Sequence, residues 1–344
     1  MPTVRWSTTR PGLVVPRPID RSGTGGPTPA GARGPRWRST SHGLYVPATT
    51  ELSADQRIAQ AAAVLGEDEA VTGWAALHWA GASWFDGTAD GVALRDVPLV
   101  ARRHLVAQPG CSVSQEFLHP REIEVVDGLP MTRAVRSVAY EMRYADGLGD
   151  AVEALDMACY ADLVSVAEVA AYVAQLGPVT GIQQARDALV EADENSWSPR
   201  ETRLRGVWTR RAGLPRPRCN VPVFTLDGRH VGTPDLIDPL SGLVGLYHGD
   251  THLSLVGASG DAVKEDAYRD VGLEPVSVLA PHWGDLDALA SRLVAASRRA
   301  AARRGARAWT LDPPRWWTPT DTVVRRRALT EGQRRRYLRY RRAA

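Results

Sequence analysis

The chain has 344 residues, with 42 Lys and Arg against 39 Asp and Glu, so its formal net charge is +3. This length exceeds one typical domain and predicts roughly two or three. Hydrophobic residues make up 44% and charged residues 24%, a globular composition that excludes a largely disordered chain. No apolar run reaches the roughly 18 to 20 residues that span a bilayer, and Met1 to Asp20 lacks the apolar block of a secretion signal. We therefore expect a cytoplasmic protein with no membrane partner.

The cysteines are few and far apart, at Cys111, Cys159 and Cys219. This spacing provides neither a disulfide framework nor a paired-cysteine zinc site, so we expect small buried hydrophobic side chains in a reducing compartment. Lys264 is the only lysine, and arginine supplies every other cationic side chain except histidine. Many of these arginines lie beyond residue 290.

The amino-terminal part begins with segment 1–23, which we expect to be a disordered tail. Segment 24–50 is rich in Pro, Gly, Ser and Arg and predicts turns around a short extended piece. Its Arg36 and Arg38 alternate with aromatic residues, as in a short wing that touches nucleic acid. The alternative is a tail segment whose aromatic residues anchor it to the core.

Residues 51–195 predict an α+β domain. Helical spacing begins near Leu52, with Ser53 as a plausible cap, and a second helix follows over 72–80. Three short strands predict a small sheet beside them, and four more helices complete the region. The strands are expected at 97–101, 112–117 and 122–126, and the helices at 133–144, 150–160, 165–176 and 181–192.

Residues 196–300 show a different pattern, with the element order αβββαβα. Ser198-Pro199 is typical of a helix cap and first turn. The predicted helices cover 199–211, 262–271 and 283–299, and the predicted strands cover 221–226, 230–237, 243–248 and 274–279. The order indicates an α/β domain, which is followed by an arginine-rich extension over 301–344.

This order of elements carries a family resemblance. The phrases are Ser198 to Arg205, Gly213-Leu214-Pro215, Asp235, and Gly249 to His252. Together they resemble a domain related to very-short-patch-repair endonucleases, and the resemblance implies a restriction-endonuclease-like fold.

The amino-terminal half resembles AbiEi-type antitoxins and transcriptional regulators of actinobacteria. The phrases that carry this resemblance are Arg36-Trp37-Arg38, Gly73 to His78, and Asp127 to Thr132. The resemblance implies an α+β region with a reduced winged-helix-like piece. The two resemblances together cover most of residues 20–300.

The resemblance to very-short-patch-repair endonucleases implies a metal-dependent nuclease site. Phosphodiester hydrolysis uses a divalent cation to polarise the phosphoryl oxygen and activate water, and Mg²⁺ prefers carboxylate oxygens. The family's helix acid matches Glu201, and its second-strand acid, a metal ligand, matches Asp235. The family's glutamate position holds Leu246, which cannot bind a cation. His248 and His252 match the histidines of the very-short-patch-repair variant.

Two interpretations of this site follow. In the active one, Asp235 and a nearby carbonyl bind Mg²⁺, His248 or His252 moves the proton, and Glu201 orients a water or the second histidine. In the degenerate one, the domain keeps its fold and its DNA-facing surface but does not cut. We favour degeneration, because a partial carboxylate set is more often a relic than a rebuilt site. Glu201 can also be a first-turn helix acid, and Asp235 a turn residue.

The carboxyl-terminal extension indicates nucleic-acid binding, because arginine forks pair with phosphate and interleaved aromatic rings stack on bases. The alternative is a solvated helix in which arginine is simply the common cation. The expected nucleic-acid contacts here are Arg325, Arg326, Arg327, Arg334, Arg335 and Arg336.

Three functions remain open from the sequence. The AbiEi resemblance implies a DNA-binding regulator or defence protein that opposes a nucleotidyltransferase-type toxin. The nuclease resemblance implies an Mg²⁺-dependent DNA endonuclease or nickase. The third possibility is a scaffold whose nuclease-like domain binds another protein.

Overall fold

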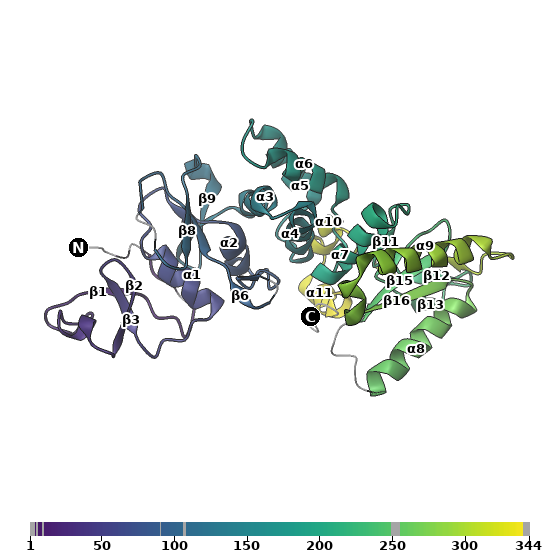
Figure 1. Ribbon diagram of the computed structural model, residues 1–344, viewed down its shortest axis with the longest axis horizontal. Coiled ribbons are helices and arrows are strands. Elements are labelled where there is room, and N and C mark those ends of the chain that lie inside the picture. The colour runs from purple at the N-terminus through teal and green to yellow at the C-terminus, as the bar shows by residue number, and fades with distance from the viewer. Residues whose placement is uncertain are drawn as a thin grey trace. The chain divides into compact units, whose positions relative to one another are not determined.

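The computed structural model (Figure 1) describes residues 4, 6–8, 10–89, 91–105, 108–248 and 255–339, with side chains left out for 255–262. The chain forms two compact units. The first contains Met1–Asp146 and Ala167–Asp187, and the second contains Gly147–Val166 and Ala188–Ala344. Both mix helices with small sheets, which confirms the α+β character expected from the sequence. The division differs from the expected boundary at residue 195, because helix α4 (Leu148–Tyr160) belongs to the second unit.

The first unit begins with a three-stranded sheet in the order β1-β3-β2. Its strands are β1 (Arg17–Pro18), β2 (Trp37–Ser41) and β3 (Leu44–Pro47). Because β1 pairs antiparallel with β3, the described part of segment 1–23 is folded rather than disordered. Arg10 adds a second anchor, since it forms ion pairs with Asp55 and Asp127 and lies 3.7 Å from the centre of the Trp79 ring.

A five-stranded sheet forms the centre of this unit, in the order β8-β7-β4-β10-β9. Its strands are β4 (Ala70–Val71), β7 (Val97–Val100), β8 (Cys111–Ser114), β9 (Ile123–Val126) and β10 (Leu129–Thr132). A small hairpin of β5 (Thr88–Ala89) and β6 (Ala93–Leu94) lies outside this sheet. The turn from β9 to β10 uses Asp127 and Gly128, both with positive φ, as two-residue hairpins require.

Helices α1 (Ala54–Ala62) and α2 (Gly73–Trp79) pack against this sheet. The predicted Ser53 cap is confirmed, since its hydroxyl accepts the Gln56 amide proton. Trp74 and Trp79 are buried, as their helical spacing predicts. The remaining helices of the region are α3 (Ala134–Tyr144), α5 (Val166–Gln175) and α6 (Ile182–Glu191).

The second unit contains a four-stranded sheet in the order β11-β14-β15-β16. Its strands are β11 (Arg218–Cys219), β14 (Leu236–Ile237), β15 (Leu243–His248) and β16 (Glu274–Leu279). Strand β15 runs antiparallel to β14 and parallel to β16. The helices are α7 (Pro199–Gly206), which continues as a π-helical turn over Val207–Arg211, α8 (Leu255–Asp270) and α9 (Leu286–Ala302).

The two faces of this sheet have separate cores, because side chains alternate along β15. Leu243 packs with Trp208 of the π-helical turn and with the apolar face of α9. Val244 and Leu246 point the other way and pack with Tyr268 of α8. Helices therefore cover both faces, which explains the nearly continuous apolar run of the central strand.

The strand predicted at 230–237 is wrong as a single element. Its first part, β13 (His230–Gly232), pairs with β12 (Val223–Thr225) in a second sheet that ends with β17 (Trp309–Thr310). The break falls at Pro234, which has no backbone N–H to give to a ladder. Asp235 therefore stands at the junction of two sheets, directly before β14.

The carboxyl-terminal extension adds two short helices, α10 (Val323–Arg327) and α11 (Glu331–Tyr337). Both begin with a threonine cap, Thr322 and Thr330. Within the described ranges, no helix is long and apolar enough to cross a membrane.

Candidate functional site

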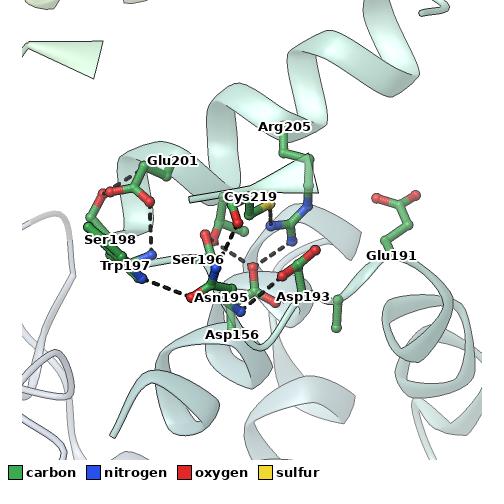
Figure 2. Close-up of polar contacts among 12 residues, drawn as sticks. Asp156, Glu191, Asp193, Asn195, Ser196, Trp197, Ser198, Glu201, Arg205 and Cys219 are labelled. Carbon is green, nitrogen blue, oxygen red and sulfur yellow. Dashed lines mark hydrogen bonds and ion pairs between the residues drawn. The ribbon is translucent and has the colours of Figure 1, made fainter. Parts of the chain in front are cut away.

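Glu201 lies in the first turn of α7, and Figure 2 shows its carboxylate turned back toward the cap. One oxygen accepts the Ser198 hydroxyl proton at 2.9 Å, and the other accepts the Trp197 amide at 2.8 Å and the Asn220 side-chain amide at 2.6 Å. Burial raises the pKa of Glu201, while these donors and Arg205 oppose the rise. Both oxygens are therefore held by the protein itself.

Asp235 is half-buried, and one of its oxygens accepts the Tyr247 amide proton at 2.5 Å. Burial raises its pKa well above the usual range, and the nearby Glu201 carboxylate raises it further. The Tyr247 hydrogen bond and the Lys264 ammonium act in the opposite direction. The helix acid and the strand acid thus interact electrostatically, and like charges in a poorly solvated place favour a retained proton.

His248 ends β15 on the face that packs against α8, and its Nε2 lies 3.0 Å from the Ser277 hydroxyl of β16. Ser277 also donates to the Glu265 carboxylate of α8. A hydroxyl carries one proton, so the His248 ring must itself donate through Nε2. Sequence reasoning missed Ser277 and Glu265, which hold this ring in place.

The remaining predicted site residues do not complete a carboxylate set. Leu246 is 7% exposed and belongs to the core on the α8 side. His252 and Asp250 lie outside the described residues. Among the side chains that the structure describes, no three or more His, Cys, Asp or Glu are arranged to hold a metal ion. The described donors therefore do not fit an Mg²⁺ centre.

A buried ion pair fixes the helix that carries Glu201. Asp156 of α4 is fully buried. Its carboxylate accepts hydrogen bonds from Arg205 at 2.5 Å, from Thr202 at 2.7 Å and from the Asp193 amide at 2.8 Å. Figure 2 shows this network beside the Glu201 cap. Burial raises the pKa of Asp156, and the Arg205 charge opposes that rise. The pair ties α7 to α4.

A second surface of the same helix faces a cleft of about 720 Å³. The guanidinium of Arg200 lies 5.3 Å from the centre of the Trp283 ring, an arrangement typical of a cation–π contact. Arg203 and Arg211 reach acidic partners, Glu153 and Asp287, at 2.8 and 3.0 Å. The arginines of this cleft are Arg200, Arg203, Arg205, Arg210 and Arg211.

The predicted nucleic-acid arginines of the extension divide into two groups. Arg326 is fully buried, where it donates to Asp162 at 2.7 Å and to the Cys159 carbonyl at 2.8 Å, so it is a core residue. Arg334 reaches the same Asp162 at 3.0 Å. The exposed group is Arg325, Arg327, Arg335 and Arg336.

The two arginines predicted on the wing have different surroundings. Arg36 is exposed, just before β2. Arg38 is half-buried and donates to Gln60 of α1 at 3.3 Å. Only the first has the exposure of a surface phosphate contact.

An aromatic cluster that the sequence did not predict lies on the second sheet. The His230 ring stacks on Trp317 with centres 5.0 Å apart, and Phe224 of β12 contacts both rings. Trp316 meets Phe224 edge to face and is 61% exposed. The adjacent residues Trp316 and Trp317 were the local indication of an aromatic cluster, but their partners Phe224 and His230 lie far away in the sequence.

In comparisons with known proteins, no family model, no curated protein and no solved structure matches this chain.

Proposed function

We propose that this protein is a DNA-associated regulator or defence protein of the AbiEi antitoxin-like kind. Its second unit would be a restriction-endonuclease-like domain that holds DNA without cutting it. The observation that carries the proposal is the state of the acid pair, in which Glu201 and Asp235 interact while the Glu201 oxygens cap and brace the protein's own scaffold.

Catalysis by a metal-dependent nuclease needs carboxylates that are ionised and available to the cation. The Glu201 carboxylate already accepts three hydrogen bonds from the protein, and burial raises the pKa of Asp235. Leu246 fills the position of the family's third acid with an apolar side chain in the core. These features favour a domain that keeps the architecture of the site and not its chemistry.

Exposed arginines supply the proposed DNA contacts. Arg325 and Arg335 are 53% and 63% exposed, and their acidic partners are also partly or largely exposed. Surface pairs of this kind contribute little, so phosphate can replace the carboxylates. The arginine cleft along α7 and the exposed Trp316 ring offer further phosphate and base contacts.

A salt titration tests DNA binding. Fluorescence anisotropy with a labelled duplex should give a log K that falls linearly with log salt, with a slope of about −0.9 per phosphate contact. The variant Arg335→Gln plus Arg336→Gln should bind more weakly with a shallower slope. The control Arg269→Gln removes an exposed arginine of α8 and should leave the slope unchanged. A salt-independent affinity, or equal slopes for all three proteins, would contradict the proposal.

Regulation needs sequence preference as well as affinity. The regulator should retard its own promoter DNA in preference to random duplex at physiological salt. Equal retardation of both would remove the regulatory part of the proposal and keep DNA binding. A nucleotidyltransferase-type toxin is the partner that the antitoxin resemblance implies, and co-purification of the two proteins tests it.

The alternative is an Mg²⁺-dependent endonuclease, which the contacts of His248 with Ser277 and Glu265 favour because they hold an imidazole in one orientation. Supercoiled plasmid with Mg²⁺ distinguishes the two. Nicking that disappears in Asp235→Ala and persists in the surface control Asp266→Ala would replace the proposed function by this alternative. Intact plasmid with all three proteins is the result we expect.

A further inference from the structure

A second cleft, of about 670 Å³, lies within the first unit and is separate from the acid pair. Strand β2 supplies Arg38 and Ser41, helix α1 supplies Gln60, and Cys111 at the start of β8 also lines the cleft. These elements come from one fold unit, so the cleft belongs to its own scaffold.

Three buried polar atoms on this cleft have no hydrogen-bond partner among the described residues. They are Nη2 of Arg38, Oγ of Ser41 and Nε2 of Gln60. Ser41 and Gln60 are each 8% exposed, so water reaches them poorly. Buried donors are normally satisfied, and a group of exceptions in one cleft calls for a ligand that supplies acceptors.

The side chains that carry these donors are held in place. Nη1 of Arg38 donates to Oε1 of Gln60 at 3.3 Å, so the guanidinium and the amide orient one another. Beyond that bond, Nη2 of the guanidinium and Nε2 of the amide are unpartnered donor atoms, each with two N–H groups. The Ser41 hydroxyl can rotate to give a third.

The charge of the cleft also favours an anion. Arg57 and Arg95 line it along with Arg38, whereas Asp96 is its one acidic lining residue among those described. Burial raises the pKa of Cys111 to about 11, and Asp96 adds to the rise, so this thiol is neutral near pH 7. The lining therefore remains net positive.

One part of the lining is apolar and open to solvent. Leu52 is 50% exposed and Leu94 is 64% exposed, and both lie on the cleft. Ligand sites of this kind combine a few placed polar groups with apolar contact area. The ligand should thus have an anionic end and an apolar or aromatic body.

We propose that this cleft binds a small phosphate monoester. The phosphate oxygens accept hydrogen bonds from Arg38, Gln60 and Ser41, and the organic part of the ligand lies against Leu52 and Leu94. A phosphate group offers three terminal oxygens, which matches the three unpartnered donors. This site does not depend on DNA binding by the second unit.

Isothermal titration calorimetry of the full chain tests the site with three probes: inorganic phosphate, adenosine 5′-monophosphate and adenosine. We expect the monophosphate to bind more tightly than inorganic phosphate, and adenosine not to bind at millimolar concentration. Heat from adenosine equal to that from the monophosphate would overturn the phosphate assignment, and so would no heat from any probe.

Variants locate the binding. Arg38→Met and Gln60→Leu should each lower the affinity for the monophosphate at least tenfold. The control Arg33→Gln removes an exposed arginine outside the cleft lining and should stay within twofold. Equal binding by all variants would place the ligand elsewhere and overturn the proposal.

A second measurement separates a lost site from a lost fold. Gln60 Nε2 is buried without a partner, and the bond that Gln60 accepts from Arg38 is long at 3.3 Å. Gln60→Leu should therefore change the melting temperature of the ligand-free protein little, and it should lose the rise that the monophosphate gives the wild type. If the protein binds duplex DNA through Arg38 and the monophosphate neither binds nor displaces that DNA, Arg38 is a DNA contact. That result would overturn the small-ligand site.

Discussion

Replacement of Glu201 by alanine tests whether this acid serves the scaffold. The change removes the acceptor for the Trp197 amide, the Ser198 hydroxyl and the Asn220 amide. A buried donor left without a partner costs about 1 to 3 kcal/mol. The Ser198 hydroxyl can turn to another acceptor, and the Asn220 amide keeps the Asn195 carbonyl at 2.8 Å. The Trp197 amide loses its bond to this carboxylate, so the expected loss in the free energy of unfolding is about 1 to 3 kcal/mol.

Urea unfolding followed by circular dichroism measures this loss. The transition of the second unit should move to lower urea in Glu201→Ala, and Glu201→Gln should lie between the variant and the wild type because it keeps one acceptor. The control is Glu331→Ala, another first-turn helix acid, whose side chain is 82% exposed. Its removal should change the stability by less than about 0.5 kcal/mol.

The scaffold role of Glu201 would be refuted by unchanged stability in Glu201→Ala. Unchanged stability combined with the loss of an Mg²⁺-dependent cleavage would identify Glu201 as part of a working nuclease site.

Three further predictions concern other groups. Asp156→Ala should lower the free energy of unfolding by about 3 to 5 kcal/mol because it leaves Arg205 buried and unpaired, whereas Asp156→Leu with Arg205→Met should recover most of the loss in urea unfolding. Additive effects of the two single changes would contradict this coupling. Burial raises the pKa of Glu116, but hydrogen bonds from neighbouring arginine and tyrosine side chains outweigh it, so its folded pKa lies below 4.5. The stabilising contribution of Glu116 is full above pH 4.5 and is lost as the pH falls through the folded pKa. Glu116→Gln should therefore flatten the acid side of a plot of unfolding free energy against pH. An unaltered acid side would contradict this prediction. With its pKa near 11 in place of 9.0, Cys111 should be alkylated by iodoacetamide at pH 8 about a hundredfold more slowly in the folded protein than in urea, and equal rates would show an ordinary thiol.

Local patterns predicted much of the secondary structure. The Ser53 cap and the helical spacing after it located α1, and both long strands of the second unit, 243–248 and 274–279, match residue for residue. These segments have a strong period or a continuous apolar run, and their neighbours do not oppose that preference.

Elements that depend on distant partners were harder to predict. Strand β10 has no clear local signal, because Asp127, Gly128 and Pro130 favour a turn, yet pairing with β9 and β4 makes it a central strand. The segment around Pro234 reads as one strand locally, but its halves pair in two different sheets. Tertiary pairing overrides propensity in both places.

The candidate site shows the same division. The Ser-x-x-Glu spacing of Ser198 and Glu201 is typical of a helix cap as well as of the family's catalytic acid. In the structure, Ser198 caps α7 and its hydroxyl accepts the Glu201 amide. Buried pairs could not be predicted, because nothing local marks Arg326 as the partner of Asp162, 164 residues away. The unpartnered donors near Gln60 likewise depend on which strand folds over α1.

One gel experiment tests most directly whether the protein holds DNA without cutting it. The protein is mixed with labelled duplex and Mg²⁺, and each sample is run on a native gel and on a denaturing gel. The proposed function predicts a retarded complex in which both strands remain intact. Shortened strands with the wild type that are absent with Asp235→Ala would contradict it.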